Sequence, residues 1–180
     1  MLTPEQEKWI NHLPDDNAVG IRCYDPHARE IFCRLEKRIR FEIGENIRIE
    51  LRGSTKLGIS GQGELDIYIP VPPDSFDRML GRMENTLGAP GSIYSLRRAR
   101  FVVYSEGTKA EIFLINDKSD DWTRCLKFEG YLETHPEALA AYEKMKLGGN
   151  GLSTREYYRR KNEFINEILA KIDSLVERLY

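Results

Sequence analysis

Residues 52–70 read Arg-Gly-Ser-Thr-Lys-Leu-Gly-Ile-Ser-Gly-Gln-Gly-Glu-Leu-Asp-Ile-Tyr-Ile-Pro, and this stretch decides the fold that we expect. It opens with the small residues Gly53-Ser54, directly after an alternating apolar run at residues 47–51. It closes with a second alternating run, Leu65, Ile67 and Ile69. Because a strand sends alternate side chains to opposite faces, the stretch predicts two strands joined by a turn.

The second predicted strand carries two carboxylates on its other face. Glu64 and Asp66 lie in the register opposite to the apolar residues, roughly 6.6 Å apart along the strand. Two carboxylates this close repel each other, and a cation such as Mg²⁺, which prefers oxygen ligands and binds substrate phosphates, would relieve the repulsion. The Gly53-Ser54 turn offers backbone N–H groups and a hydroxyl to those phosphates. The alternative is an ordinary solvated strand face.

The spacing of these residues resembles a known motif. A Gly-Ser turn followed about a dozen residues later by an acidic-apolar-acidic triplet is typical of the DNA polymerase beta-like nucleotidyltransferase superfamily. Gly53-Ser54 and Glu64-Leu65-Asp66 fill this pattern. Such sites use carboxylates to clamp metal ions ~3.5–4 Å apart. Glu64 and Asp66 would supply two ligands, and Glu111, an acid in an otherwise apolar predicted strand, would complete the metal site or act as base. Taken alone, Glu111 would be a surface residue.

Candidate phosphate contacts lie in two places. The first is the motif itself, Gly53-Ser54-Thr55-Lys56. The second is the last predicted helix, where Lys161 shares the apolar stripe with Tyr157, Phe164 and Ile165. A lysine on an apolar face either extends its ammonium to the edge, forms a structural salt bridge or meets a phosphate. We therefore assign Gly53, Ser54, Thr55, Lys56, Tyr157 and Lys161 as candidate nucleotide-binding residues.

Composition excludes several classes of protein. The 180 residues carry nearly balanced charges with a formal net charge of −2, which does not indicate a protein that binds bulk nucleic acid. The three cysteines, without metal-binding spacing, predict reduced thiols of a cytoplasmic protein. We expect no signal peptide and no membrane association.

The predicted elements alternate between helices and strands. Capping, proline and glycine signals predict helices near residues 3–13, 25–43, 75–87, 120–134, 136–147 and 153–179. Strands are expected at residues 47–51, 64–71, 99–105 and 109–115, the last two forming a hairpin. The fold class is α/β (or α+β), a small mixed sheet with flanking helices. Within one compact domain, residues 1–118 would form the nucleotidyltransferase-like core, and residues 119–180 a C-terminal helical segment that closes the cleft.

The order of motifs along the chain resembles the GrpB family of predicted nucleotidyltransferases. The resemblance spans roughly residues 20–172 and departs from the family at residues 57–60 and at Phe128-Glu129-Gly130, where the family tends to have Phe-Arg-Asp and thus an arginine that could bind phosphate. The matching motifs are Tyr24-Asp25-Pro26, Phe32, Gly53-Ser54-Thr55, Leu65-Asp66-Ile67, Trp122, Leu126-Lys127-Phe128-Glu129-Gly130-Tyr131-Leu132, His135-Pro136, Tyr157, Lys161 and Phe164-Ile165.

The resemblance implies metal-dependent transfer of a nucleoside monophosphate from an NTP to an acceptor. ATP is the expected donor and Mg²⁺ or Mn²⁺ the expected cofactor, while the acceptor (a small molecule, RNA or a protein) and the oligomeric state stay open. One rival is a non-catalytic nucleotide-binding or protein-interaction module on the same fold, and another is a scaffold with a solvated acidic strand. Convergence of Glu64, Asp66 and Glu111 on one point would favour the enzyme, and a Lys161 far from Gly53-Ser54 the scaffold.

Overall fold

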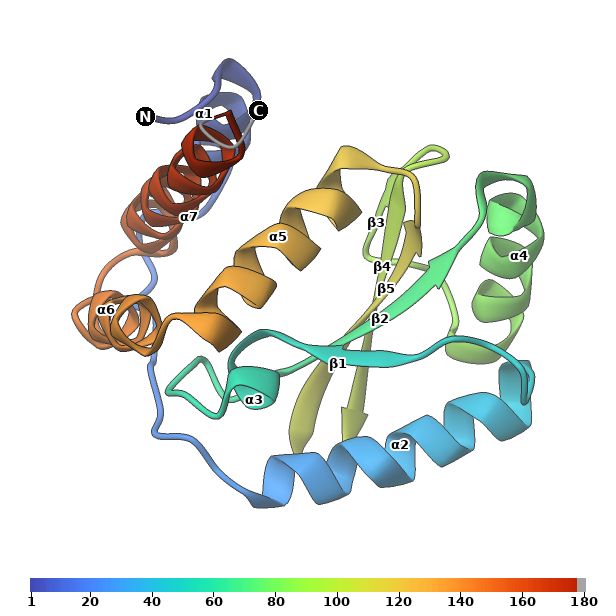
Figure 1. Cartoon of the computed structure of the whole chain (residues 1–180). Helices are drawn as coiled ribbons and strands as arrows, with labels where there is room; N and C mark the ends of the chain where they lie inside the picture. Colours follow the sequence, from blue (N-terminus) through green and yellow to red (C-terminus); the bar gives the residue numbers. More distant parts are fainter. Residues whose placement is uncertain (178–180) are drawn as a thin grey trace. The chain divides into compact units, whose positions relative to one another are not determined.

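The computed structural model describes residues 1–177, which form two compact units. The sheet unit comprises Tyr24–Ile59 and Gly63–Thr123. The helical unit comprises Met1–Cys23, Ser60–Gln62 and the described residues from Arg124 onward. The elements in chain order (Figure 1) are α1 (Pro4–Asn11), α2 (His27–Ile43), β1 (Glu50–Arg52), α3 (Gly53–Leu57), β2 (Leu65–Val71), the 3₁₀ helix η1 (Pro73–Ser75), α4 (Phe76–Leu87), β3 (Ser92–Tyr94), β4 (Arg98–Ser105), β5 (Thr108–Asn116), α5 (Asp120–Thr134), α6 (Pro136–Leu147) and α7 (Thr154–Glu177).

A mixed five-stranded sheet organises the sheet unit, as the sequence predicts. Its strand order is β1-β2-β5-β4-β3. The central pair β2 and β5 is parallel, and the other neighbours are antiparallel. The predicted hairpin is the β4–β5 pair, whereas the short edge strand β3 has no counterpart among the predicted strands. With its flanking helices, this sheet confirms the α/β class.

The first predicted strand differs from the observed one. Residues 47–49 belong to no strand, and β1 begins at Glu50, opposite Tyr68 of β2. Continuing this register would bring Arg48 opposite Pro70, which has no backbone N–H to donate. The ladder accordingly stops before Pro70, and β1 is three residues long.

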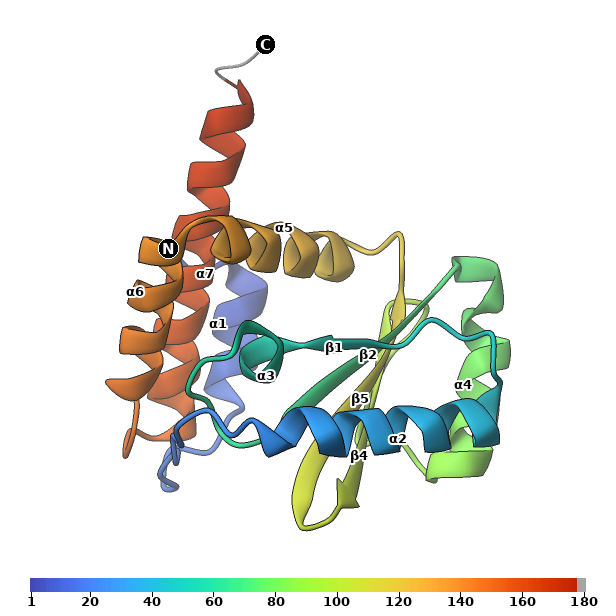
Figure 2. The same ribbon diagram turned by 60° about the horizontal axis from the view of Figure 1, so that its bottom comes forward.

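One face of the sheet packs against α2 and α4 to form the core of the sheet unit. Both helices lie beside the sheet, and their axes run crosswise to each other in the two views (Figures 1 and 2). Burial of each large side chain here contributes about 1.5–3 kcal/mol. The strand residues of the core are Leu65, Ile67, Ile69, Val71, Ala99, Phe101, Ala110, Ile112 and Leu114, and their main helix partners are Ile31, Leu35, Ile39, Ile43, Phe76 and Met83.

The helical unit contains α1, α6, α7 and most of α5. The predicted capping box at its first helix is present, because the Thr3 side chain accepts from the Gln6 N–H while the Gln6 side chain accepts from the Thr3 N–H. α1 lies beside α7 in both views (Figures 1 and 2). Helices α5 and α6 have the predicted bounds, and the predicted end of the last helix at Leu179 falls outside the described residues.

Within residues 1–177, no helix combines the length and the apolar character that crossing a membrane would require. The division of the chain at residue 118 into a core and a closing helical segment stays a prediction. The compact units themselves divide the chain elsewhere, because the first 23 residues belong to the helical unit.

Candidate functional site

A row of paired residues crosses the sheet unit on the face opposite the core. Asp66 of β2 pairs with Arg52 of β1 on one side and with Glu111 of β5 on the other. Glu111 in turn pairs with Val102 of β4. Directly paired residues project from the same face of a sheet, on strands about 4.8 Å apart. The structure thus places two of the three predicted acids side by side.

The segment predicted as a Gly-Ser turn is the short helix α3. It follows β1 without a break and ends at Gly58, a left-handed C-cap with φ of +69°. Gly53 has φ of +67°, and a Cβ at this position would overlap the Asp66 carboxylate. Glycine is required here for two reasons, the positive φ and the close approach of Asp66. Gly53, the first residue of α3, therefore lies next to Asp66.

The other two motif residues are held by neighbouring elements. Thr55 is buried, and its hydroxyl lies 3.4 Å from the Glu64 carbonyl oxygen. The Lys56 carbonyl oxygen accepts a 2.8 Å hydrogen bond from Arg29 of α2. These contacts fix the backbone of α3 against β2 and α2, so the Thr55 side chain is occupied in packing.

Two cations engage the acids in a charged cluster formed by Glu64, Asp66, Glu111, Lys109 and Arg100. The Lys109 Nζ donates to Glu64 Oε1 at 2.8 Å and to Glu111 Oε1 at 2.9 Å. Arg100 Nη1 donates to the same Glu111 oxygen at 2.9 Å. Partial burial lowers the pKa of the Lys109 ammonium, but the hydrogen bonds that it donates to Glu64 and Glu111 outweigh this effect and raise that pKa well above its ordinary value. Lys109 is therefore a permanent positive charge in the charged cluster.

This arrangement bears on the predicted metal centre. Among residues 1–177, no group of three or more His, Cys, Asp or Glu side chains is arranged to hold a metal ion. Glu64 and Glu111 both direct an oxygen at the Lys109 ammonium, in the place that a bridging metal ion would need. The residues present do not fit a three-carboxylate metal centre in this arrangement, and the metal-binding and catalytic roles of Glu64, Asp66 and Glu111 stay predictions.

Lys109 and Arg100 are site residues that the sequence interpretation missed. The signal for Lys109 was present, since residues two apart on a strand share a face, and Lys109 is two residues before Glu111. Arg100 had no local signal, because it lies on a neighbouring strand eleven residues earlier in the chain.

An aromatic cluster adjoins the charged cluster on the same face. The rings of Tyr68 and Phe113, paired on β2 and β5, have centroids 4.7 Å apart. Trp122 at the start of α5 stacks on Tyr68 at 5.9 Å, and the Arg52 guanidinium lies 4.8 Å from the Trp122 ring centroid. Arg52, Glu50 and Arg48 are linked by ion pairs beside this ring. This face of the sheet thus carries a charged cluster next to an aromatic cluster, and the sequence interpretation missed the aromatic cluster as well.

The remaining predicted residues belong to the helical unit. Tyr157 of α7 is buried, with its ring centroid 5.4 Å from that of Tyr158. The Lys161 ammonium lies 5.3 Å from the Tyr158 ring centroid, one turn further along the helix. The position of the helical unit relative to the charged cluster is not determined, so the nucleotide contacts proposed for Tyr157 and Lys161 stay predictions.

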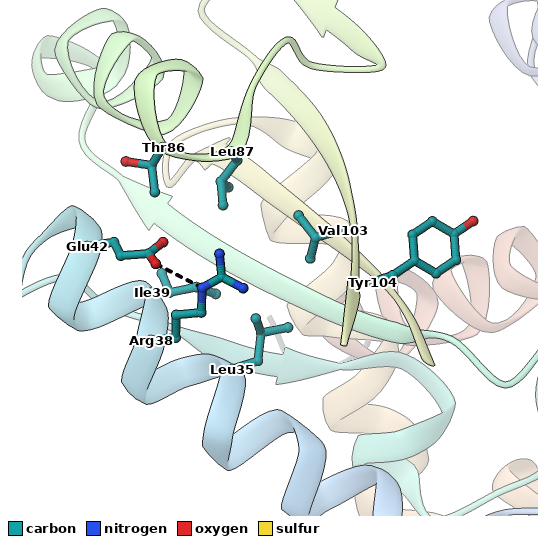
Figure 3. Close-up of a pocket in the computed structure, with 8 residues that line it drawn as sticks. All are labelled: Leu35, Arg38, Ile39, Glu42, Thr86, Leu87, Val103 and Tyr104. Carbon is teal, nitrogen blue, oxygen red and sulfur yellow. Dashed lines mark hydrogen bonds and ion pairs between the residues drawn. The ribbon is translucent and has the colours of Figure 1, made fainter. Parts of the chain in front are cut away.

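A hollow of about 200 Å³ lies on the α2 and α4 side of the sheet unit. Its two charged side chains pair with each other, since Arg38 Nε donates to Glu42 Oε1 at 2.9 Å. The Tyr104 ring points away from the other lining residues (Figure 3). The hollow lacks a set of polar groups directed at a common point, so it is a weaker candidate than the charged cluster. It is lined by Leu35, Arg38, Ile39, Glu42, Thr86, Leu87, Val103 and Tyr104.

Fold and site together define an α/β protein whose mixed sheet has a helix-covered core face and an opposite face with clustered charges. The family described as GrpB protein matches residues 18–171. Because the match covers most of the chain, this chain belongs to the GrpB family.

Structural comparison agrees with the family. The crystal structure of the conserved protein GrpB from Enterococcus faecalis is similar with a TM-score of 0.62 at 17% sequence identity. The similarity covers 84% of this chain and 98% of that protein, so nearly the whole fold of the Enterococcus protein is present in this chain. No curated protein sequence matches this chain. The placement in the nucleotidyltransferase superfamily stays a prediction.

Proposed function

We propose that this chain transfers a nucleoside monophosphate from an NTP, with ATP as the expected donor, to an acceptor hydroxyl or phosphate. The observation that carries the proposal is the strand register, which puts Glu111 directly beside Asp66 on the face that Gly53 approaches. A Glu111 that faced solvent away from Asp66 would have favoured the non-catalytic binding module. In the reaction, an acceptor oxygen forms a bond to the α-phosphorus while the bond to the pyrophosphate leaving group breaks.

In this proposal, one group of residues binds the phosphates and Asp66 orients them. The backbone at Gly53-Ser54 and the cations Lys56 and Lys161 would bind phosphates, with Tyr157 supporting Lys161 from the same helix. Asp66 would orient the phosphates through a cation that arrives with them. We propose Mg²⁺ or Mn²⁺ as this cofactor, since Mg²⁺ is commonly bound by one or two carboxylates together with substrate phosphates. The nucleotide is the proposed partner, and the acceptor is a small molecule, RNA or protein.

Calorimetry with ATP and the other NTPs tests the proposal. The titrations use the wild type, Asp66→Asn and the control Asp77→Asn, an exposed acid on α4, with Mg²⁺ or Mn²⁺ present and then chelated. We expect metal-dependent binding that weakens about tenfold or more in Asp66→Asn and is unchanged in the control. Equal affinity of Asp66→Asn and wild type, or no nucleotide binding by the wild type, would contradict the proposal.

A second candidate function is nucleotide binding, or protein interaction, without transfer. The ion pairs that Lys109 makes with Glu64 and Glu111 favour it, because an engaged carboxylate is a poor base. The two functions differ in pyrophosphate release. Incubation with the bound nucleotide and pools of hydroxyl-bearing small molecules, RNA or protein would release pyrophosphate from a transferase, and none from a binding module.

A further inference from the structure

The charged cluster contains its own cation, the Lys109 ammonium, and the position of this ammonium determines where a divalent ion could bind. Lys109 lies two residues before Glu111 on β5, so their side chains share a face. Glu64 immediately precedes β2 and reaches the same ammonium. The Lys109 Nζ therefore bridges two carboxylates from two strands, at 2.8 and 2.9 Å.

A divalent ion that bridged Glu64 and Glu111 would need the space that the Lys109 ammonium occupies. Mg²⁺ binds carboxylate oxygens at about 2.0–2.1 Å and demands nearly octahedral geometry. An ammonium within hydrogen-bonding distance of both carboxylates repels any second cation at that point. Arg100 adds a further positive charge on the Glu111 oxygen that Lys109 already uses.

The charge of the cluster agrees with this geometry. Glu64 and Glu111 bring two negative charges, and Lys109 and Arg100 bring two positive charges. These four side chains carry no net charge together, whereas a two-metal centre relies on the full charge of its carboxylates. The pair Glu64 and Glu111 is thus already neutralised by side chains on the neighbouring strands.

We propose that Lys109 is the built-in cation of this site and excludes a divalent ion from the position between Glu64 and Glu111. Loss of the Lys109 charge then turns Glu64 and Glu111 into a new divalent-cation site. Lys109 is a positioning residue by this proposal, because it acts through the two glutamates. The inference goes beyond the proposed function, and its test needs no nucleotide.

The test is a count of bound Mn²⁺ by electron paramagnetic resonance of the free ion, without nucleotide. The variants are Lys109→Met, the control Lys118→Met (an exposed lysine after β5) and Lys109→Met combined with Glu111→Gln. We expect Lys109→Met to bind one Mn²⁺ more than the wild type, and the control to match the wild type. Adding Glu111→Gln should remove the extra ion.

Two results would overturn the inference. One is an unchanged Mn²⁺ count in a Lys109→Met protein whose circular dichroism shows it to be folded. The other is a wild type that already loses a bound Mn²⁺ when Glu111→Gln is introduced. If Lys109→Met does not fold, Lys109→Gln removes the charge while keeping a hydrogen-bond donor, and the same count applies to it. Failure of the nucleotide titrations alone would refute the proposed function and leave the Mn²⁺ count to decide on Lys109.

Discussion

The two faces of the sheet are built from the same strands, yet one face is apolar and buried and the other carries paired charges. On the core face, Ile67 and Ile112 are completely buried and paired across β2 and β5. On the other face, the next residues back along each strand, Asp66 and Glu111, are paired in the same register. A slip of one residue would turn every apolar side chain to the charged face. The apolar face therefore sets the register, and the charged cluster inherits it.

The comparison also predicts how the faces respond to substitution. Stability should depend mainly on the core face, where truncation leaves a cavity that water does not fill. On the charged face, partly exposed ion pairs contribute less to stability, and their main consequence is which ions and ligands can bind. The following predictions run from the largest expected effect to the smallest.

The largest effect is expected for Ile67→Ala in the centre of β2. The side chain is fully buried, so its truncation should lower the free energy of unfolding by about 2–5 kcal/mol. The control is Val102→Ala on the charged face of β4, where the residue is 37% exposed and the loss should stay below about 1 kcal/mol. Urea denaturation measures both. Similar losses for the two variants would break the distinction between the faces.

Gly53→Ala probes the point at which α3 meets the charged face. A side chain at φ of +67° costs about 1–2 kcal/mol, and its Cβ would in addition displace the Asp66 carboxylate. The matched control is Gly58→Ala, at φ of +69° with no atom within 4 Å of the added Cβ. Denaturation should therefore show a greater loss of stability for Gly53→Ala. If Asp66 has the proposed role, nucleotide titration should show weaker binding for Gly53→Ala alone, and equal behaviour of the two variants would argue against this close approach.

Much of this architecture could be predicted from the sequence, because alternation and capping are local signals. The alternating Leu65, Ile67 and Ile69 gave β2, and the hairpin residues gave β4 and β5. The helix α3 could not be predicted, since five residues are too few to show a helical period. The extent of β1 depends on Pro70, nearly twenty residues away, and no local pattern in β1 reveals it.

The charged cluster was predictable in part for a related reason. The acids stood out because each interrupts an apolar strand, and strand pairing then brought Asp66 to Glu111. The cations did not stand out, because Lys109 and Arg100 look like ordinary charges at strand positions exposed to solvent. Their role follows from the strand order β2-β5-β4, which is a property of the whole sheet.

A carboxylate outside the sheet sharpens the comparison, because its hydrogen bonds come from a backbone N–H and a hydroxyl. In the helical unit, Glu143 accepts from the Ser60 N–H at 2.8 Å and from the Ser60 hydroxyl at 2.7 Å. The backbone hydrogen bond from Ser60, followed by its hydroxyl, lowers the pKa of the Glu143 carboxyl. A lowered pKa means that the folded state prefers the ionised carboxylate, and this preference stabilises the fold above the pKa of an unfolded glutamate.

We therefore expect Glu143→Gln to lower the free energy of unfolding by about 1 kcal/mol at neutral pH, since the amide oxygen accepts more weakly than a carboxylate. The difference from the wild type should shrink as the pH falls below the ordinary glutamate pKa through the lowered folded value, because the wild-type carboxyl then becomes protonated. Urea denaturation across this pH range measures the difference, with Glu137→Gln, an exposed glutamate in the first turn of α6, as control. A difference that stays constant with pH would show that the charge of Glu143 is not what the Ser60 donors stabilise.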